Sequence, residues 1–182
     1  MQCAAKDVGK STLFNKVSGK RISIVEDTPG ITRDRIYADA EWCGHHFTLI
    51  DTGGIEPSRK DVILSQMREQ AQMALDMADV ILFMVNVRDG VTAADKEVAA
   101  MLRKCSRPVL LVCNKVDNPG NPPMEMYEFY NLGIGEPYPV SSIHGLGLGD
   151  LLDEMVALFP AAAAEETEED IIHVAIVGKP NA

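Results

Sequence analysis

Residues 8–12 (VGKST) place a glycine, a lysine and two hydroxyl side chains directly before an apolar stretch that is typical of a helix start. In a phosphate-binding loop of the pattern G-x-x-x-x-G-K-[ST], backbone N–H groups of the loop point at phosphate oxygens. Lys10 would then reach the β- and γ-phosphates of a nucleotide, and the Ser11 hydroxyl would bind Mg²⁺. The match is incomplete, because Ala4 stands where the first glycine is expected. Taken alone, the segment is also explained as an ordinary helix start.

Residues 51–54 (DTGG) follow the segment HHFTLI and fit the pattern D-x-x-G. A carboxylate at a strand end can hold the water shell of Mg²⁺, which keeps most of its waters in proteins. We therefore expect Asp51 to serve the metal and the Gly54 amide to contact a γ-phosphate. Taken alone, the same four residues also fit a simple turn.

Residues 114–117 (NKVD) follow the apolar segment PVLLVC, and residues 141–145 (SSIHG) follow PYPV. Asp117 can accept two hydrogen bonds, from the N1–H and from the exocyclic amine of guanine. Adenine offers no such pair of donors, so its binding would leave the carboxylate unpaired. Asn114 would brace the loops, and the backbone around Ser142 would contact the guanine carbonyl oxygen. The alternative explanation is a polar strand end with no base to recognise.

Thr32 lies in the segment EDTPGITRD, between the lysine-containing loop and DTGG. A threonine here would reach Mg²⁺ once the γ-phosphate is present, as in switch segments that order on GTP and relax on hydrolysis. By itself a threonine in a Pro-Gly loop indicates little. The order of the five segments, each after an expected strand or helix start, favours one nucleotide site over unrelated matches.

Apolar and helix-like segments alternate along the chain. Two segments that alternate apolar and polar residues predict an antiparallel hairpin, at residues 35–42 and 46–51. Continuous apolar runs predict buried strands at residues 80–87 and 108–115, and a short strand is expected in PYPVSS. Helices are expected at residues 60–77, 93–104, 124–131 and 148–158. This pattern predicts an α/β, doubly wound, mostly parallel sheet with helices on both faces, of the P-loop NTPase type. The motifs fall at the carboxyl ends of strands, where such sheets bind ligands.

The two ends of the chain raise a question about the sheet. We expect residues 1–160 to form one domain that lacks its first strand. Residues 161–170 (AAAAEETEED) have the composition of an acidic linker, and residues 171–182 are expected to start a second domain. The segment HVAIVGKPNA is the kind of strand and loop that the N-terminus lacks. It would fill the empty strand position, in the same molecule or in a neighbour. Residues 178–182 and 8–11 would then form a split phosphate loop.

The chain has 182 residues, a net charge of -10 and a sequence pI of about 4.8. An acidic chain has no electrostatic attraction to nucleic acid, so no direct nucleic-acid footprint is expected. No apolar stretch reaches the ~18 residues of a membrane span, and the start has no hydrophobic signal core. These features predict a cytoplasmic location and no membrane partner. The four cysteines show no CxxC spacing, which predicts reduced thiols instead of a zinc site.

On these motifs the chain resembles the TRAFAC class of GTPases and, more narrowly, the Der (EngA) family of bacterial tandem GTPases. The phrases that carry the resemblance are STLFNK, EDTPGITRDR, DTGGIE, VNVRDGVTAADKEVA, NKVD and SSIHGLGLGDLLDEM. The resemblance implies that guanine nucleotide (GTP/GDP) and Mg²⁺ bind and that GTP is hydrolysed. It also implies action on the large ribosomal subunit, through parts of a longer protein that lie outside this chain.

The resemblance assigns roles to residues at the matching positions. Catalytic roles fall on Lys10, Thr32 and Gly54, and metal binding falls on Ser11, Thr32 and Asp51. The residues expected to contact GTP are Asp7, Val8, Gly9, Lys10, Ser11, Thr12, Asp51, Thr52, Gly53, Gly54, Asn114, Lys115, Asp117, Ser141, Ser142 and Ile143.

Two positions depart from what related GTPases use for catalysis. The K⁺-binding asparagine of the family falls on Asp7, which leaves activation by K⁺ open. Ile55 stands where a glutamine orients water in Ras-like GTPases, so another group must orient it and slow turnover is expected. Besides a GTPase, the sequence leaves open a non-catalytic G-domain fragment and another TRAFAC GTPase such as an Era-like protein. A P-loop ATPase or kinase is disfavoured by NKVD.

Overall fold

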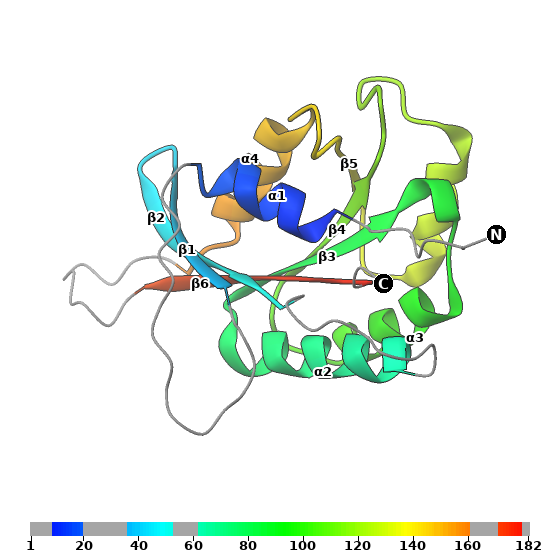
Figure 1. Cartoon of the computed structure of the whole chain (residues 1–182), viewed down its shortest axis with the longest axis horizontal. Coiled ribbons are helices and arrows are strands. Elements are labelled where there is room, and N and C mark those ends of the chain that lie inside the picture. The colour runs from blue at the N-terminus through cyan, green and yellow to red at the C-terminus, as the bar shows by residue number, and fades with distance from the viewer. Residues whose placement is uncertain (1–8, 20–35, 53–61, 161–170, 180–182) are drawn as a thin grey trace.

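The computed structural model describes residues 9–19, 36–52, 62–160 and 171–179. A six-stranded sheet runs through it in the order β1-β2-β6-β3-β4-β5 (Figure 1). Only β1 runs antiparallel to its neighbour, and all other pairs are parallel. The strands are β1 (Ile36–Trp42), β2 (His45–Asp51), β3 (Val80–Asn86), β4 (Val109–Asn114), β5 (Pro137–Pro139) and β6 (Ile172–Gly178).

Helices cover both faces of this sheet (Figure 1). On one face, α1 and α4 pack over a core that includes Leu13 and Leu151. On the other face, α2, α3 and the 3-10 helix η2 pack over a core that includes Val98 and Phe129. The helices are α1 (Lys10–Val17), α2 (Val62–Met77), the 3-10 turn η1 (Val87–Asp89), α3 (Ala93–Leu102), η2 (Met124–Leu132) and α4 (Leu148–Ala157). The predicted doubly wound α/β fold is confirmed.

The hairpin of β1 and β2 follows the predicted alternation. Ala38 and Ala40 are buried, whereas Asp39 and Glu41 between and after them are exposed, because successive side chains of a strand point to opposite faces. The two residues of the turn, Cys43 and Gly44, have φ values of 50° and 81°. Positive φ at both turn residues is what a tight type I′ hairpin turn requires.

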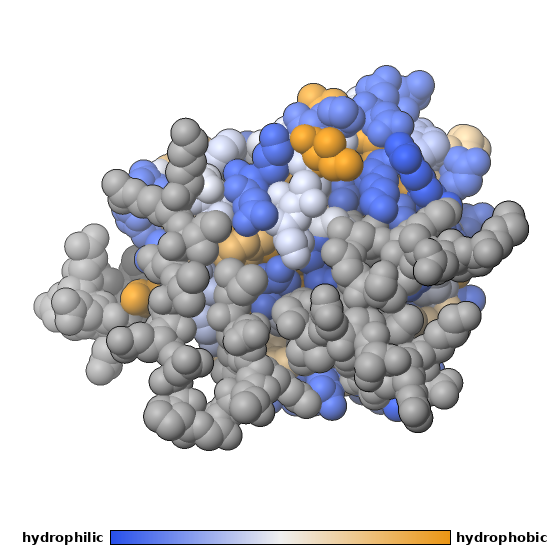
Figure 2. All heavy atoms as spheres, in the orientation of Figure 1, coloured by the Kyte–Doolittle hydropathy of each residue, from blue (hydrophilic) through white to orange (hydrophobic). Residues whose placement is uncertain are grey.

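Strands β3 and β4 are interior strands of the sheet and are buried along nearly all of their length. Burial on both faces explains why their sequences are continuous apolar runs instead of alternating ones. Between them in sequence, α3 begins with a capping box in which Thr92 and Asp95 satisfy each other's backbone N–H groups. On the face shown in Figure 2, the described surface is mainly hydrophilic, as expected when apolar side chains fill two internal cores.

Strand β6 comes from the last part of the chain and lies in the middle of the sheet. It pairs in parallel with β2 on one side and with β3 on the other, so that Val174 lies opposite both Leu49 and Val80. Its side chains alternate between the two cores: Ile176 packs with α1 and α4, and Val177 packs with α2 and α3. The C-terminal segment therefore takes a strand position between β2 and β3 of the same molecule, one of the two possibilities predicted from the sequence.

Among the described residues, no helix is both long enough and apolar enough to cross a membrane.

Candidate functional site

The first turn of α1 faces the carboxyl end of β6. The Lys10 side chain is 3% exposed, and its Nζ donates hydrogen bonds to the carbonyl oxygens of Gly178 at 2.9 Å and Lys179 at 2.8 Å. These oxygens compensate the buried ammonium group for the water that it has lost. The end of β6 and the start of α1 are 168 residues apart in the chain, yet they are in direct contact here.

Gly9 joins this loop to the rest of the site. Its φ is 88°, a left-handed conformation that side chains with a Cβ rarely adopt. A Cβ at this position would lie 2.4 Å from the Asn114 Nδ2 atom at the end of β4. Glycine is therefore required here both by backbone geometry and by close approach to Asn114.

Ser11 and Asp51 meet beside the lysine. The Ser11 hydroxyl donates to Asp51 Oδ2 at 3.1 Å, and Asp51 is buried at the end of β2. One hydroxyl and one carboxylate are hard oxygen donors, which suits Mg²⁺ because this ion retains several waters. No larger group of acidic, histidine and cysteine side chains with metal-binding geometry occurs among the described residues. The residues present thus fit Mg²⁺ better than a cation that demands a full protein cage.

Thr52, the next residue along the chain, points elsewhere. Its side chain is buried and donates a hydrogen bond of 2.6 Å to the carbonyl oxygen of Ile176 in β6. Its hydroxyl therefore fixes the end of β2 against β6. Because the Thr52 hydroxyl is engaged with β6, a contact between Thr52 and nucleotide would use the Thr52 backbone.

The loops after β4 and β5 are tied together by one side chain. Asn114 Oδ1 accepts from the Ser142 backbone N–H at 2.9 Å and from the Ser142 hydroxyl at 3.0 Å, and all of these atoms are buried. Lys115, which follows, has a φ of 67°, an uncommon left-handed conformation for a residue with a long side chain. Backbone strain of this kind is retained where the surrounding contacts over-determine the loop, as they do in functional sites.

Asp117 lies at the exposed end of the same loop. Its two carboxylate oxygens accept hydrogen bonds of 3.0 and 2.9 Å from Arg88 Nη2. Both residues line an open cavity of about 360 Å³, within the size range of small-molecule sites. The cavity is lined by Gly9, Thr12, Arg88, Asn114, Lys115, Asp117, Ser141, Ser142, Ile143 and His144.

Most of the sequence-predicted residues that the structure describes converge on this edge of the sheet. The base-recognition set lines the cavity, and Gly9 and Thr12 extend it toward Lys10. Sequence reasoning gave no role to Arg88, although a charged residue directly after a buried strand was a usable signal. The predicted residues that lie outside the described part of the chain are Asp7, Val8, Thr32, Gly53 and Gly54.

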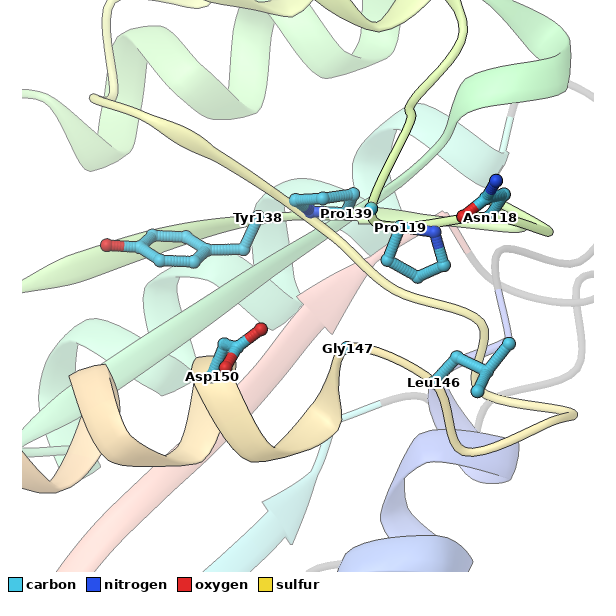
Figure 3. Close-up of a pocket in the computed structure, with 8 residues that line it drawn as sticks. Asn118, Pro119, Tyr138, Pro139, Leu146, Gly147 and Asp150 are labelled. Atoms are coloured by element: carbon cyan, nitrogen blue, oxygen red, sulfur yellow. The ribbon is translucent and has the colours of Figure 1, made fainter.

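A second cavity, of about 370 Å³, is lined by residues that follow Asp117 and by residues around β5 and the start of α4. Its lining includes Pro119, Tyr138 and the start of α4, and Figure 3 shows Asp150 pointing from α4 toward β5. Partial burial, followed by the nearby Glu154 and Glu136, raises the pKa of Tyr138 above its ordinary value. None of the residues predicted to contact nucleotide lines this cavity.

Comparisons with known proteins agree with this geometry. Residues 5–115 match the family described as 50S ribosome-binding GTPase. The chain is 63% identical over 176 residues to GTPase Der of Ruminiclostridium cellulolyticum, covering 97% of this chain and 40% of that protein. It is also 63% identical over 175 residues to GTPase Der of Acetivibrio thermocellus, covering 96% of this chain and 40% of that protein. The resemblance to the Der family is confirmed, and the chain spans about 40% of the length of these relatives.

Solved structures show the same fold. The G domain of the T. maritima FeoB iron transporter superposes with a TM-score of 0.59 at 23% identity, covering 85% of this chain and 93% of that one. The FeoB G-domain from Methanococcus jannaschii superposes with a TM-score of 0.55 at 18% identity. The superposition covers 85% of this chain and 92% of that one. With this fold and a family match over residues 5–115, the chain belongs to the 50S ribosome-binding GTPase family.

Proposed function

We propose that this chain binds GTP and GDP together with Mg²⁺ and hydrolyses GTP, as the nucleotide-binding part of a longer protein. The observation that carries this function is the convergence of Lys10 and Asp117 on one edge of the sheet, with Gly9 packed against Asn114 between them. An ammonium group for phosphates and a carboxylate for a base are then held at the two ends of a single site.

Recognition of the base would depend on Asp117. Its carboxylate would accept hydrogen bonds from the N1–H and the exocyclic amine of guanine. Asn114 supports this arrangement, because it holds Ser142 and hence the loop after β5 in place. Ser141 and Ile143 line the same cavity and would present backbone groups to the guanine carbonyl oxygen. Adenine would leave the carboxylate without donors, at a cost that gives preference for guanine.

Hydrolysis would use water that attacks the γ-phosphorus in line, forming one P–O bond while the bond to the β,γ-bridging oxygen breaks. The products are GDP and phosphate. Lys10 would exchange its contacts with Gly178 and Lys179 for phosphate oxygens, and Gly54 would donate its amide to the γ-phosphate. Ser11, Asp51 and Thr32 would hold Mg²⁺, whose chemistry here is to offset phosphate charge. Ile55 has no hydrogen-bonding side chain, so slow intrinsic turnover is expected.

K⁺ activation is a finer part of this proposal. A cation bound near the phosphates would supply charge stabilisation that Ile55 and the rest of the switch do not. Asp7 occupies the position of the family's K⁺-binding asparagine. Phosphate release should then be faster in K⁺ than in Na⁺ at equal ionic strength, and equal rates in the two salts would remove K⁺ from the mechanism.

The longer protein would carry the remaining functions. We propose that residues 1–160 correspond to a first G domain, residues 161–170 to a linker and residues 171–182 to the opening of a second domain, in a cytoplasmic protein that acts on the large ribosomal subunit. The length of the curated relatives supports this organisation. With a net charge of -10, this chain itself would add little to contacts with ribosomal RNA.

A thermal melt with Mg²⁺ and, in turn, GDP, GTP and ADP tests the proposal. A ligand that binds only the native state stabilises it by about 2.7 kcal/mol at one hundred times its Kd. We expect GDP and GTP to raise the melting temperature and ADP to leave it unchanged. No rise with any of the three nucleotides would overturn the guanine site.

A second candidate is a G domain that binds nucleotide without hydrolysing it. The departures at Ala4 and Asp7 in the phosphate loop favour it. Phosphate release from GTP separates the two: stabilisation by GDP with no release above a sample lacking protein would favour binding alone.

A further inference from the structure

Arg88 makes a contact that the proposed guanine site has to break. It belongs to η1, the short turn directly after β3, and its Nη2 lies 3.0 and 2.9 Å from the two oxygens of Asp117. A single NH₂ group of Arg88 therefore donates to both carboxylate oxygens of Asp117. In the proposed site these oxygens are the acceptors for the two donors of guanine.

Hydrogen bonds fix the backbone at Arg88, whereas its side chain is exposed and is held to Asp117 by a solvent-accessible ion pair. Asn86 accepts a hydrogen bond of 3.1 Å from the Arg88 N–H and donates one of 2.9 Å to Asp89. The Arg88 and Asp117 side chains are 57% and 71% exposed. A rotation of the Arg88 side chain could therefore uncover the carboxylate without rebuilding the turn.

An arginine and a guanine edge compete for the same face of the carboxylate. An ionised carboxylate only accepts hydrogen bonds, and its strongest bidentate partners approach in its plane. Arg88 Nη2 already occupies both carboxylate oxygens, and Arg88 lines the same cavity as Asp117 and Ser142. Guanine can make its paired hydrogen bonds only after the guanidinium group has left.

We propose that Arg88 is a specificity-determining latch on Asp117, which opens when guanine binds. This inference rests on the proposed function, because the latch controls the base-recognition carboxylate of that same site. Molecules in which Arg88 holds Asp117 cannot pair with guanine. The apparent affinity for guanine is therefore the intrinsic affinity multiplied by the fraction of molecules in which Asp117 is uncovered. The latch acts before the base docks, so it lowers the association rate and leaves the dissociation rate nearly unchanged.

The size of the effect follows from the exposure of the pair. Exposed ion pairs are weak, so we expect removal of the latch to raise guanine affinity by only about two- to fivefold. Salt screens exposed charges, so the gain should shrink between about 0.05 M and 0.5 M salt. A nucleotide that does not use Asp117, such as ADP, should gain nothing.

The test compares the full chain with its Arg88→Gln variant in stopped-flow binding of GDP and ADP with Mg²⁺. Arg68→Gln is the matched control, because Arg68 also donates two hydrogen bonds to an exposed carboxylate, that of Glu97, on helices away from the cavity. Both variants lose one positive charge, so any general effect on phosphate attraction appears in both. Melting without nucleotide checks that each variant is folded.

We expect Arg88→Gln to raise the GDP association rate about two- to fivefold relative to Arg68→Gln, with ADP unchanged. An equal GDP rate in both variants, or a slower one in Arg88→Gln, would overturn the latch and leave the guanine site standing. An equal gain for ADP would also overturn it, since Arg88 would then act on the phosphates. If GDP binds to none of the proteins, both the latch and the proposed function fail.

Discussion

At the base end of the site, Asn114 reaches Ser142 across 28 residues of chain, whereas at the phosphate end Lys10 reaches Gly178 across 168. The base end is built by the loops after two neighbouring strands, β4 and β5. The phosphate end needs α1 from the start of the chain and β6 from its last part. The two ends meet at Gly9, where a Cβ would press on Asn114.

This difference indicates that the two ends depend on the fold in different ways. The base-side loops follow strands that pair directly with each other, so their geometry is set by a compact local unit. The phosphate side exists only when β6 has inserted between β2 and β3. Closing a longer loop adds little to the equilibrium cost, because that cost rises only with the logarithm of loop length. Because the phosphate end includes β6 itself, its geometry is lost as soon as β6 leaves the sheet.

Deletion of residues 171–182 should have the largest effect and abolish cooperative folding. It removes the central strand, whose Val174, Ala175, Ile176 and Val177 side chains are fully buried. Loss of one large buried apolar side chain already costs about 2–5 kcal/mol, against a total stability of roughly 5–15 kcal/mol. Circular dichroism during heating measures the outcome.

The control for that deletion is Ile171→Ala, next to the strand, where the side chain is 54% exposed. This change should alter the free energy of unfolding by less than about 0.5 kcal/mol. An unchanged melting curve after the deletion would show that both ends of the site form without β6.

Asp117→Ala should act on the base end alone. Loss of two hydrogen bonds to a charged group should lower the affinity for GDP by about 100-fold and remove the preference for GDP over ADP. Calorimetric titration with GDP, guanosine and ADP measures this. If guanosine binding were unaffected, the carboxylate would not be the group that recognises the base.

Lys10→Met should act on the phosphate end alone. We expect about a 10- to 100-fold loss of GDP affinity, because a charged hydrogen-bond donor to phosphate is removed. Guanosine, which has no phosphate, should bind as it does to the unchanged chain. Titration of the two ligands side by side separates the ends, and an equal loss for both would show that Lys10 also shapes the base end.

Gly9→Ala should disturb the junction between the ends. The left-handed backbone costs a residue with a Cβ about 1–2 kcal/mol, and the Cβ would also press on Asn114 at 2.4 Å. Gly19→Ala is the matched control, with a φ of 62° and no neighbour within 4 Å of its Cβ. Urea unfolding should show that Gly9→Ala lowers the free energy of unfolding more than Gly19→Ala does. Gly9→Ala should also weaken GDP binding. Equal losses would mean that backbone conformation alone makes glycine necessary.

Ser142→Ala should have the smallest effect. It removes the hydroxyl donor to Asn114 Oδ1 but keeps the backbone N–H donor to the same oxygen. A neutral hydrogen bond contributes about 1 kcal/mol to stability. We therefore expect urea unfolding to show a free energy of unfolding lower by that amount or less, with little change in GDP affinity. A loss of guanine preference would show that the hydroxyl itself positions the loop after β5.

Much of the fold could be predicted because its elements have local signals. The hairpin of β1 and β2 alternates in sequence, and β3 and β4 are unbroken apolar runs. Boundaries fell within a few residues; the helix expected at residues 124–131 is the 3-10 helix η2, Met124–Leu132. The sequence pattern of buried residues, such as Met126 and Phe129, indicates a helix but does not distinguish a 3-10 helix from an α-helix.

The candidate site was predictable in its residue types but not in its contacts. Asp117 and Asn114 were found because a short motif follows a buried strand. The Arg88 contact and the approach of Gly9 to Asn114 join segments that are far apart in sequence, so no local pattern signals them.

The sequence by itself predicted a nucleotide site, because Lys10 and Ser11 stand at a helix start and Asp51 and Asp117 come after apolar segments, in the expected order. It also predicted an apolar strand in the last part of the chain. Only the tertiary structure decided where that strand goes. A gap between β2 and β3 can accept any apolar strand of suitable length, from the same chain or from another copy. Here the chain closes on itself, and Lys10 meets the end of β6.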